Sequence, residues 1–238
     1  MDNLPDVCIL LLTANRLEYA KRTLKSVMKN IIYPGGNLRL HIADDGSPEG
    51  YIPELLGVVE EKLPLSISNS QRAGYGTNYN LALQVVHPSA EIILPLEDDW
   101  ELMSPLRLDY LVRAIQEGEE TLQFGCIRMG YIGWTQELRG KFVSAANQHF
   151  LLFDPDSSEP HVWAGHPRLE TRSWQRYVGP WPEGNYDPGT TEFMVAQRPE
   201  ARRGVVWPMD LIHPYGSLFA HIGSTQARTD QRQEAVSV

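Results

Sequence analysis

Three consecutive acidic residues, Glu97, Asp98 and Asp99, follow an apolar run in the segment EIILPLEDDWEL. Such a cluster has three readings: it binds a divalent cation, it carries out acid–base chemistry, or it is simply solvated. Carboxylate oxygens are the ligands that hard ions such as Mg²⁺ and Mn²⁺ prefer. Because the apolar run leads directly into the acids, the first two readings place a chemical site at the end of a buried strand.

Two further polar clusters stand in the same relation to an apolar run. Residues 13–16, Thr-Ala-Asn-Arg, follow the run VCILLL, and residues 44–47, Asp-Asp-Gly-Ser, follow the run LRLHIA. The carboxyl ends of parallel strands meet at one rim of a sheet, where ligands of α/β proteins bind. We therefore expect all three clusters to converge on one site.

The order of the predicted elements supports this arrangement, because strand and helix signals alternate through the first half of the chain. Short apolar runs predict buried strands, and apolar residues at helical spacing predict the helices between them. The predicted strands are 7–12, 38–43, 65–68 and 91–96, and the predicted helices are 15–31, 51–63, 76–86 and 104–118. Asn15 followed by Glu18 predicts a capping box at the start of the first helix.

This order predicts an α/β fold with a Rossmann-like, mostly parallel central sheet flanked by helices. The second half, from about residue 120, is rich in Trp, Gly and Pro. It predicts an irregular region that shapes an acceptor pocket.

Charge and composition disfavour some functions. The formal net charge is -9 and the isoelectric point is about 5.3, whereas unspecific binding to a nucleic-acid backbone needs a basic face. Cys8 and Cys126, both in apolar surroundings, predict buried free thiols in a reducing compartment. The start of the chain lacks a basic segment, and no apolar run is long enough to span a bilayer. We therefore expect a cytoplasmic protein without a transmembrane segment, with peripheral membrane attachment left open.

Four segments, in this order, resemble the motifs of family 2 glycosyltransferases of the GT-A fold: VCILLLTANR, IADDGS, NSQRAGYGTNYNLAL and ILPLEDDWEL. The E-D-D form of the last segment is also similar to that of N-acetylglucosaminyltransferase I-type enzymes. The resemblance covers about residues 7–200. The domain organisation that it implies is a single domain at 1–223, with a nucleotide-sugar-binding half at 1–103, an acceptor-binding half at 104–223, and a polar tail at 224–238.

On the donor side, the resemblance implies contacts to a nucleotide sugar. Asp45 matches the acid that contacts the base, and Asp98 matches the acid on the ribose side. Asp99 matches the last acid of the D-x-D motif, which binds a metal on the diphosphate, so Mn²⁺ or Mg²⁺ is the implied cofactor. The other donor-side residues are Thr13, Asn15 and Arg16 after the first strand, Gly74 and Asn80 at the nucleotide loop, and Glu97, which acts through water. Ala14 stands where family members commonly carry an aromatic residue on the nucleobase, so the resemblance does not specify uridine.

On the acceptor side, the family pattern E-D-x-x-L-x-x-R aligns with TEFMVAQR at 191–198. This alignment places Glu192 at the catalytic base, which removes a proton from an acceptor hydroxyl as that hydroxyl attacks the anomeric carbon. The stereochemical outcome would be inversion. Asp187 is the rival base. Trp163 and Trp181 either stack on the acceptor or belong to the core.

A histidine late in the chain is a candidate extra metal ligand, because many GT-A enzymes place one there. His221, in FAHIGS, matches that position, and His213, in LIHPYG, is its rival. The implied reaction is inverting, metal-dependent transfer of one hexosyl or N-acetylhexosaminyl group from a nucleotide-diphosphate sugar. A glycan, a lipid carrier, a small metabolite and a modified nucleobase are the acceptor classes left open. The alternatives are a nucleotidyltransferase acting on a sugar phosphate, and a non-catalytic protein that binds sugar nucleotides or glycans.

Overall fold

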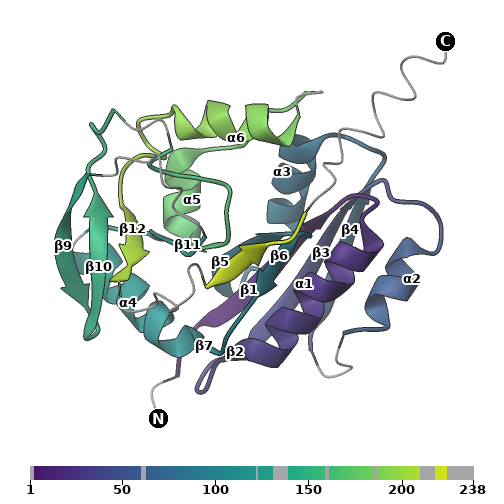
Figure 1. Cartoon of the computed structure of the whole chain (residues 1–238), viewed down its shortest axis with the longest axis horizontal. Coiled ribbons are helices and arrows are strands. Elements are labelled where there is room, and N and C mark those ends of the chain that lie inside the picture. The colour runs from purple at the N-terminus through teal and green to yellow at the C-terminus, as the bar shows by residue number, and fades with distance from the viewer. Residues whose placement is uncertain are drawn as a thin grey trace.

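The structure is a computed structural model of the 238-residue chain. It describes residues 3–59, 63–121, 123–130, 139–158, 161–184, 187–209 and 218–223. Within these residues a nine-stranded sheet runs through the molecule in the order β4-β3-β1-β5-β11-β8-β12-β10-β9, and helices flank it (Figure 1). The predicted α/β class with a large central sheet is confirmed.

Four parallel strands from the first half form one side of this sheet. They are β1 (Asp6–Thr13), β3 (Leu38–Asp45), β4 (Leu65–Ser70) and β5 (Ala90–Glu97), with β1 between β3 and β5. Nearly all of β1 is buried, as expected of a parallel strand that is covered on both faces. Pro95 is tolerated within β5 because the described pairing with β11 involves only Ile92 and Ile93 of that strand.

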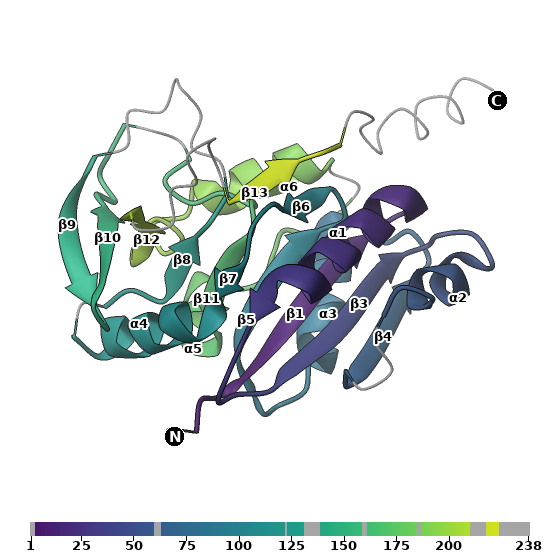
Figure 2. The ribbon, with the colours of Figure 1, turned by 60° about the horizontal axis from the view of Figure 1, so that its bottom comes forward.

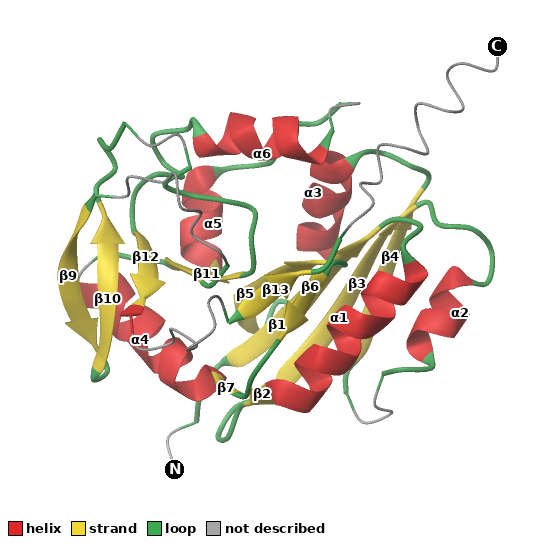
Figure 3. Ribbon diagram, viewed as in Figure 1, coloured by secondary structure: helices red, strands yellow, loops and turns green. Residues whose placement is uncertain are grey.

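Helices cover the sheet on both faces, and successive residues of β1 point to different layers. Val7, Ile9 and Leu11 belong to a core cluster that includes residues of α1 (Leu17–Asn30), α2 (Tyr51–Leu56) and α4 (Leu108–Thr121). Cys8, Leu10 and Leu12 belong to a second cluster with residues of α3 (Tyr75–Val85), α5 (Arg172–Val178) and α6 (Pro188–Ala196). Figure 3 shows these helices on either side of the strands. Both cysteines are free and buried, as predicted.

The second half is more regular than the sequence predicted, since five of its strands extend the same sheet. They are β8 (Cys126–Arg128), β9 (Gly140–Ala145), β10 (Gln148–Phe153), β11 (Arg168–Thr171) and β12 (Val205–Pro208). β11 runs antiparallel to β5, so the direction of the sheet changes at the junction of the two halves. These strands were missed because they have only three to six residues and the connections between them are long.

Two small sheets fasten distant segments to this core. β6 (Trp100–Leu102) pairs antiparallel with β13 (Phe219–His221), and β2 (Ile31–Ile32) pairs parallel with β7 (Leu106–Arg107). In Figure 2, β13 crosses beside β6 close to the start of α1. The end of the described chain is thereby placed next to the acids that follow β5.

Each of the two core clusters contains residues from both predicted halves. The first contains Val7 and Phe150, and the second contains Leu10 and Val205. No helix among the described residues combines the length and apolarity needed to cross a membrane.

Candidate active site

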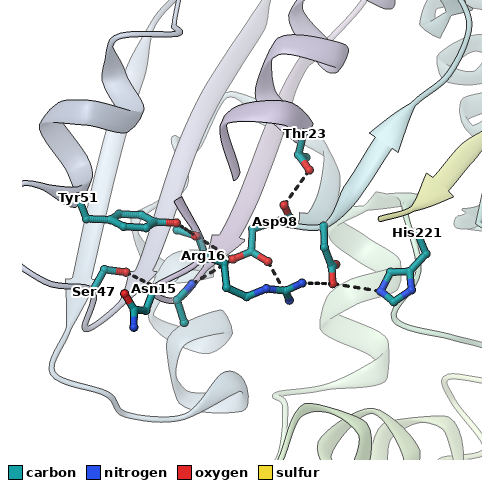
Figure 4. A network of polar contacts seen from close by, with 10 residues as sticks. Asn15, Arg16, Thr23, Ser47, Tyr51, Asp98 and His221 are labelled. Carbon is teal, nitrogen blue, oxygen red and sulfur yellow. Dashed lines mark hydrogen bonds and ion pairs between the residues drawn. The ribbon is translucent and has the colours of Figure 1, made fainter. Parts of the chain in front are cut away.

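The three strand ends that were predicted to converge lie at one rim of the sheet. The parallel register pairs Thr13 of β1 with Asp44 of β3, and Leu12 with Glu97 of β5. Polar side chains from the following turns form a continuous network at this rim (Figure 4). The acids Asp98 and Asp99 stand at its centre.

Asp98 is buried and is held by the end of β1. Its carboxylate accepts hydrogen bonds from the Thr13 hydroxyl at 3.0 Å and the Ala14 N–H at 3.3 Å, and it pairs with Arg16 Nη1 at 3.2 Å. Its main-chain carbonyl accepts from the Thr23 hydroxyl at 2.8 Å. Burial raises the pKa of Asp98 to about 7, although the charge of Arg16 opposes this rise. The strand end and the helix start together fix the orientation of this carboxylate.

Asp99 lies between Arg16 and His221, the predicted second metal ligand. Its Oδ2 accepts from Arg16 Nη2 at 2.6 Å and lies 3.1 Å from His221 Nε2. His221 is brought here because β13 places it opposite Trp100, and the two rings lie 4.8 Å apart between centroids. The sequence therefore identified two side chains, 122 residues apart, that meet in space.

The residues at Asp99 fit a divalent cation that has few protein ligands. Asp99 Oδ1 is buried and has no hydrogen-bond partner, so one acceptor oxygen is unused beside an imidazole. Carboxylate oxygen and imidazole nitrogen are both common metal donors. In the described part of the chain, no three His, Cys, Asp or Glu side chains gather into a metal site. A cation at Asp99 would therefore take its remaining ligands from a diphosphate and water.

Glu97 connects the donor-side acids with the second half. Burial, together with the negative charges of Asp99, Glu192 and Asp98, raises its pKa to about 8, although the nearby Tyr75 hydroxyl opposes the rise. At neutral pH Glu97 is therefore mostly protonated in the metal-free protein. Glu97 and Glu192 lie close enough to influence each other although they come from different halves of the chain.

Asp45 organises the turn that precedes α3. Its carboxylate accepts from the Ser70 hydroxyl at 2.7 Å and from the N–H groups of Ala73 at 2.6 Å and Gly74 at 3.1 Å. Gly74 has φ of 86°, a left-handed conformation that favours glycine. The two predicted nucleotide-side residues Asp45 and Gly74 thus meet in one turn.

Asn15 adopts φ of 53°, in the left-handed region that Asn tolerates better than most residues. Its N–H donates to the Ser47 hydroxyl at 2.7 Å and so connects the turns after β1 and β3. The predicted capping box is wrong, because Arg16 is the N-cap of α1 and no side chain caps the helix there. The left-handed turn at Asn15 replaces the extended conformation that an N-cap residue needs.

Asn80 fastens α3 to the chain that follows α5. Its amide group donates to the Trp181 carbonyl at 3.0 Å and to Glu183 at 2.8 Å, and its oxygen accepts from the Trp181 N–H at 2.9 Å. A Cβ at Gly76, one turn earlier, would lie 1.9 Å from the Pro182 carbonyl oxygen. The close approach of the backbones at Gly76 and Pro182 and the hydrogen bonds of Asn80 together hold the segment around Trp181 beside the turn that precedes α3.

Glu192 and Asp187, the two candidate bases, have different surroundings on α6. Glu192 is partly buried, and its Oε1 accepts from the N–H of Gly165 at 2.5 Å. Asp187 is the N-cap of α6, where its carboxylate accepts from the N–H of Thr190 at 2.8 Å and from its hydroxyl at 2.7 Å. Helix capping accounts for Asp187, whereas Glu192 lies near the donor-side acids.

Trp163 and Trp181 lie in the core. They are 1% and 5% exposed, and their rings pack 5.3 Å apart around the buried guanidinium of Arg168. Arg168 pairs with Glu170 and donates to the Tyr79 hydroxyl at 3.0 Å. The core reading of the two tryptophans agrees with this placement, and rings so deeply buried offer no open face to an acceptor.

Sequence reasoning missed three features of the site. The Tyr75 hydroxyl lies near Glu97, and the hydroxyls of Tyr51 and Thr13 are hydrogen-bonded beside Asp98. The Arg168–Glu170 pair lies against the rings of Trp163 and Trp181. The position of Tyr75 directly after Gly74 was the sequence signal that could have indicated its place at the site. His213 and the predicted tail at 224–238 lie outside the described residues.

The fold and the rim of acids are those of α/β proteins that bind ligands at the carboxyl ends of parallel strands. The sequence model of glycosyl transferase family 2 matches residues 8–174, well over half of the chain. The chain belongs to this family. No curated protein matches it.

Solved structures with a similar fold are GT-A glycosyltransferases of low sequence identity. S. aureus TarS 1–349 in complex with UDP-GlcNAc has a TM-score of 0.62 at 14% identity, over 93% of this chain and 62% of that one. The mannosyltransferase PcManGT from Pyrobaculum calidifontis, in complex with GDP-Man and Mn²⁺, has a TM-score of 0.55 at 17% identity, over 86% and 56%. A longer TarS structure gives 0.58 at 15%, over 92% and 37%. The chain thus spans between about a third and two thirds of these proteins.

Proposed function

We propose that this protein is an inverting, metal-dependent glycosyltransferase that moves one sugar from a nucleotide-diphosphate sugar to an acceptor hydroxyl, with Glu192 as the base. The observations that support the proposal are that Glu192 accepts from the N–H of Gly165 at 2.5 Å, and that the ring of the next residue, His166, lies 5.0 Å from the ring of Trp100, which directly follows Asp99. The proposed base and the acids that follow β5 are thus connected through one short segment of the chain. The family match favours sugar transfer over the nucleotidyltransferase alternative.

The donor side of the rim supports a nucleotide diphosphate. Similar folds have been solved with UDP-GlcNAc and with GDP-Man and Mn²⁺. Asp98, fixed by Thr13 and Arg16, is the proposed contact to the ribose, and Asp45 with Gly74 forms the turn that is proposed to contact the base. Asp99 and His221 would hold a divalent cation, which when bound neutralises the charge that develops on the diphosphate leaving group.

The surroundings of Glu192 support its role as the proposed base. The N–H of Gly165 fixes one carboxylate oxygen of Glu192, which leaves the other to accept the proton of an acceptor hydroxyl. Phe193 and Met194, the next two residues of α6, are 46% and 39% exposed. These exposed apolar side chains lie on the helix that carries the proposed base and are candidates for contact with an acceptor.

A thermal-shift screen tests the donor side. It uses UDP, GDP, CDP, ADP and dTDP and their common sugars, each with and without Mn²⁺ or Mg²⁺. A ligand that binds only the folded state raises the melting temperature, so metal-dependent stabilisation by one diphosphate is expected.

The stereochemistry of transfer with the donor so identified is then determined by NMR of the product, whose anomeric configuration should be opposite to that of the donor. Retained configuration would overturn the assignment of an inverting mechanism. No transfer to any member of a broad acceptor panel would favour the non-catalytic sugar-nucleotide-binding alternative.

The identity of the base is tested by two matched amide substitutions. Glu192→Gln should lower kcat at least about 100-fold, because general base catalysis contributes about 10²–10⁴-fold. Asp187→Asn keeps a good N-cap residue on α6 and should leave kcat within a few-fold of wild type. The reverse pattern would assign the base to Asp187.

A further inference from the structure

Arg16 supplies positive charge at the centre of the donor site. Its Nη1 lies 3.2 Å from Asp98 Oδ1, and its Nη2 lies 2.6 Å from Asp99 Oδ2. Figure 4 shows Arg16 between Asp98 and His221, and Asp99 contacts both Arg16 and His221. Two adjacent buried carboxylates need a counter-ion, because isolated buried charges are strongly disfavoured.

The carboxylate oxygen that Arg16 binds is also the one nearest His221. His221 Nε2 lies 3.1 Å from Asp99 Oδ2. When this nitrogen donates a hydrogen bond to the carboxylate, it cannot also act as a metal ligand. A guanidinium has hydrogen-bond donors only, and its charge repels a cation. Arg16 in this position and a metal shared by Asp99 and His221 therefore exclude each other.

The ion pair also leaves two groups unsatisfied. Arg16 Nε and Asp99 Oδ1 are both buried and neither has a hydrogen-bond partner. An unused guanidinium N–H is complementary to a phosphate oxygen, and an unused carboxylate oxygen is complementary to a cation. A buried polar group without a partner costs free energy. A phosphate oxygen at Arg16 Nε and a cation at Asp99 Oδ1 would together satisfy both groups.

The chain end that carries His221 packs directly against this pair. The N–H of Ile222 donates to the Asp99 main-chain carbonyl at 2.8 Å. A Cβ at Gly223 would lie 2.1 Å from Asp99 Oδ2 and 2.5 Å from Arg16 Nη2, so a larger residue there would displace the two side chains. The Arg16 side chain is only 17% exposed. The pair is thus a packed part of the site.

We propose that Arg16 is an internal counter-ion that keeps a divalent cation off Asp99 until a nucleoside diphosphate binds, so that the two ligands bind as a linked pair. This inference rests on the proposed metal-dependent function. A diphosphate offers the guanidinium a bidentate partner. When Arg16 turns to the phosphate, Asp99 and His221 become available to the cation. By linkage, each ligand must then tighten the binding of the other by the same factor.

The test is a Mn²⁺ titration in which the EPR signal of free Mn²⁺ is measured, with and without UDP or GDP. The proteins are the wild type, Arg16→Gln, Asp99→Asn and Arg22→Gln. Arg22→Gln is the matched control. It removes the same charge from α1, whose N-cap is Arg16, but from an exposed ion pair with Glu101. We expect a diphosphate to lower the wild-type Kd for Mn²⁺ at least tenfold. Arg16→Gln should bind Mn²⁺ alone at least tenfold more tightly than Arg22→Gln and gain less from the diphosphate.

The outcomes separate the inference from the function on which it rests. Equal Mn²⁺ affinity of Arg16→Gln and Arg22→Gln would overturn the counter-ion role while leaving the metal site in place. Wild-type protein that binds Mn²⁺ equally well with and without diphosphate would also overturn it, and this measurement needs no variant to fold. If Asp99→Asn bound Mn²⁺ as the wild type does, the proposed metal site itself would be wrong and the inference with it.

Discussion

Arg168 and Glu170 form a buried ion pair beneath the catalytic rim. Both are at most 2% exposed, and Arg168 also donates to the carbonyl of Gly165 at 3.0 Å, the residue whose N–H binds Glu192. The rings of Trp163 and Trp181 lie against the guanidinium. Burial lowers the pKa of Arg168, but Glu170, Tyr79, Tyr75 and Cys126 together more than offset this, so Arg168 stays charged. The pair therefore connects core packing with the position of the proposed base.

Glu170→Gln should destabilise the protein strongly, because it leaves Arg168 charged and buried without its partner. Removing one member of a buried pair costs about 3–5 kcal/mol, which a shift of the urea unfolding midpoint would measure. Glu101→Gln is the control, since its partner Arg22 is 52% exposed and such pairs contribute under about 1 kcal/mol. Equal shifts of the urea midpoint for Glu170→Gln and Glu101→Gln would contradict the prediction that the buried ion pair contributes more to stability than the exposed one.

The donor-side acids were predictable from the sequence, and the residues that support them were not. Asp98 and Asp99 follow an apolar run, and strand ends of parallel sheets converge, so local pattern was sufficient. Arg168 and Glu170 carry no such mark, because nothing in the segment RLE indicates that both charges are buried. Likewise, the capping role of Asp187 became visible only with the start of α6.

Among the strands, β3 and β4 are connected by an unusual buried histidine. His41 on β3 is fully buried, and its ring nitrogens lie 2.7 Å and 2.9 Å from the hydroxyls of Ser66 and Ser68 on β4. Two serines at alternate positions of one strand lie on the same face, which lets one imidazole bind both. Burial lowers the pKa of His41 to about 4. The neutral ring therefore holds the edge strand of the sheet.

The contribution of His41 to stability should fall between pH 7 and pH 5. Its folded-state pKa of about 4 lies below the ordinary value of about 6.5, so between these values the His41 ring binds more protons in the unfolded chain. About 2 kcal/mol of this contribution is lost on going from pH 7 to pH 5. Glu97 and Asp98, whose pKa values are raised to about 8 and about 7, act in the opposite direction in this window. The difference between the wild type and His41→Asn in chemical unfolding at both pH values therefore measures the His41 contribution, whereas His87→Asn, at an exposed position, should keep the wild-type pH dependence.

Strand and helix predictions succeeded where periodicity was strong and failed where elements were short. β1, β3, β4 and β5 were found because each reads as an apolar run or alternates along its length. α2 ends at Leu56, well before the predicted end at 63. β11 and β12 have four residues each, and tertiary pairing with β5 and β8 decides their structure more than their own sequence does.

The two core clusters join the halves 1–103 and 104–223 of the predicted single domain. Val7 and Phe150 share one cluster, and Leu10 and Val205 share the other. We therefore expect a single thermal transition, with tryptophan fluorescence and far-UV circular dichroism giving the same midpoint. Two resolved transitions would show that the halves fold separately. In that case a fragment of residues 1–103 would also fold alone, which we do not expect.

The reversal of direction between β5 and β11 has an evolutionary consequence. Because β11 runs antiparallel, the rim where β5 ends with its acids is the rim where β11 begins, next to Gly165 and Glu192. The proposed donor-side contacts come from the turns after parallel strands, whereas the proposed acceptor-side residues come from the approach to β11 and from α6. Substitutions in these later segments can change which acceptor meets the base while the donor-side strands keep their pairing. The same donor machinery can in this way be inherited unchanged while acceptor preference diversifies.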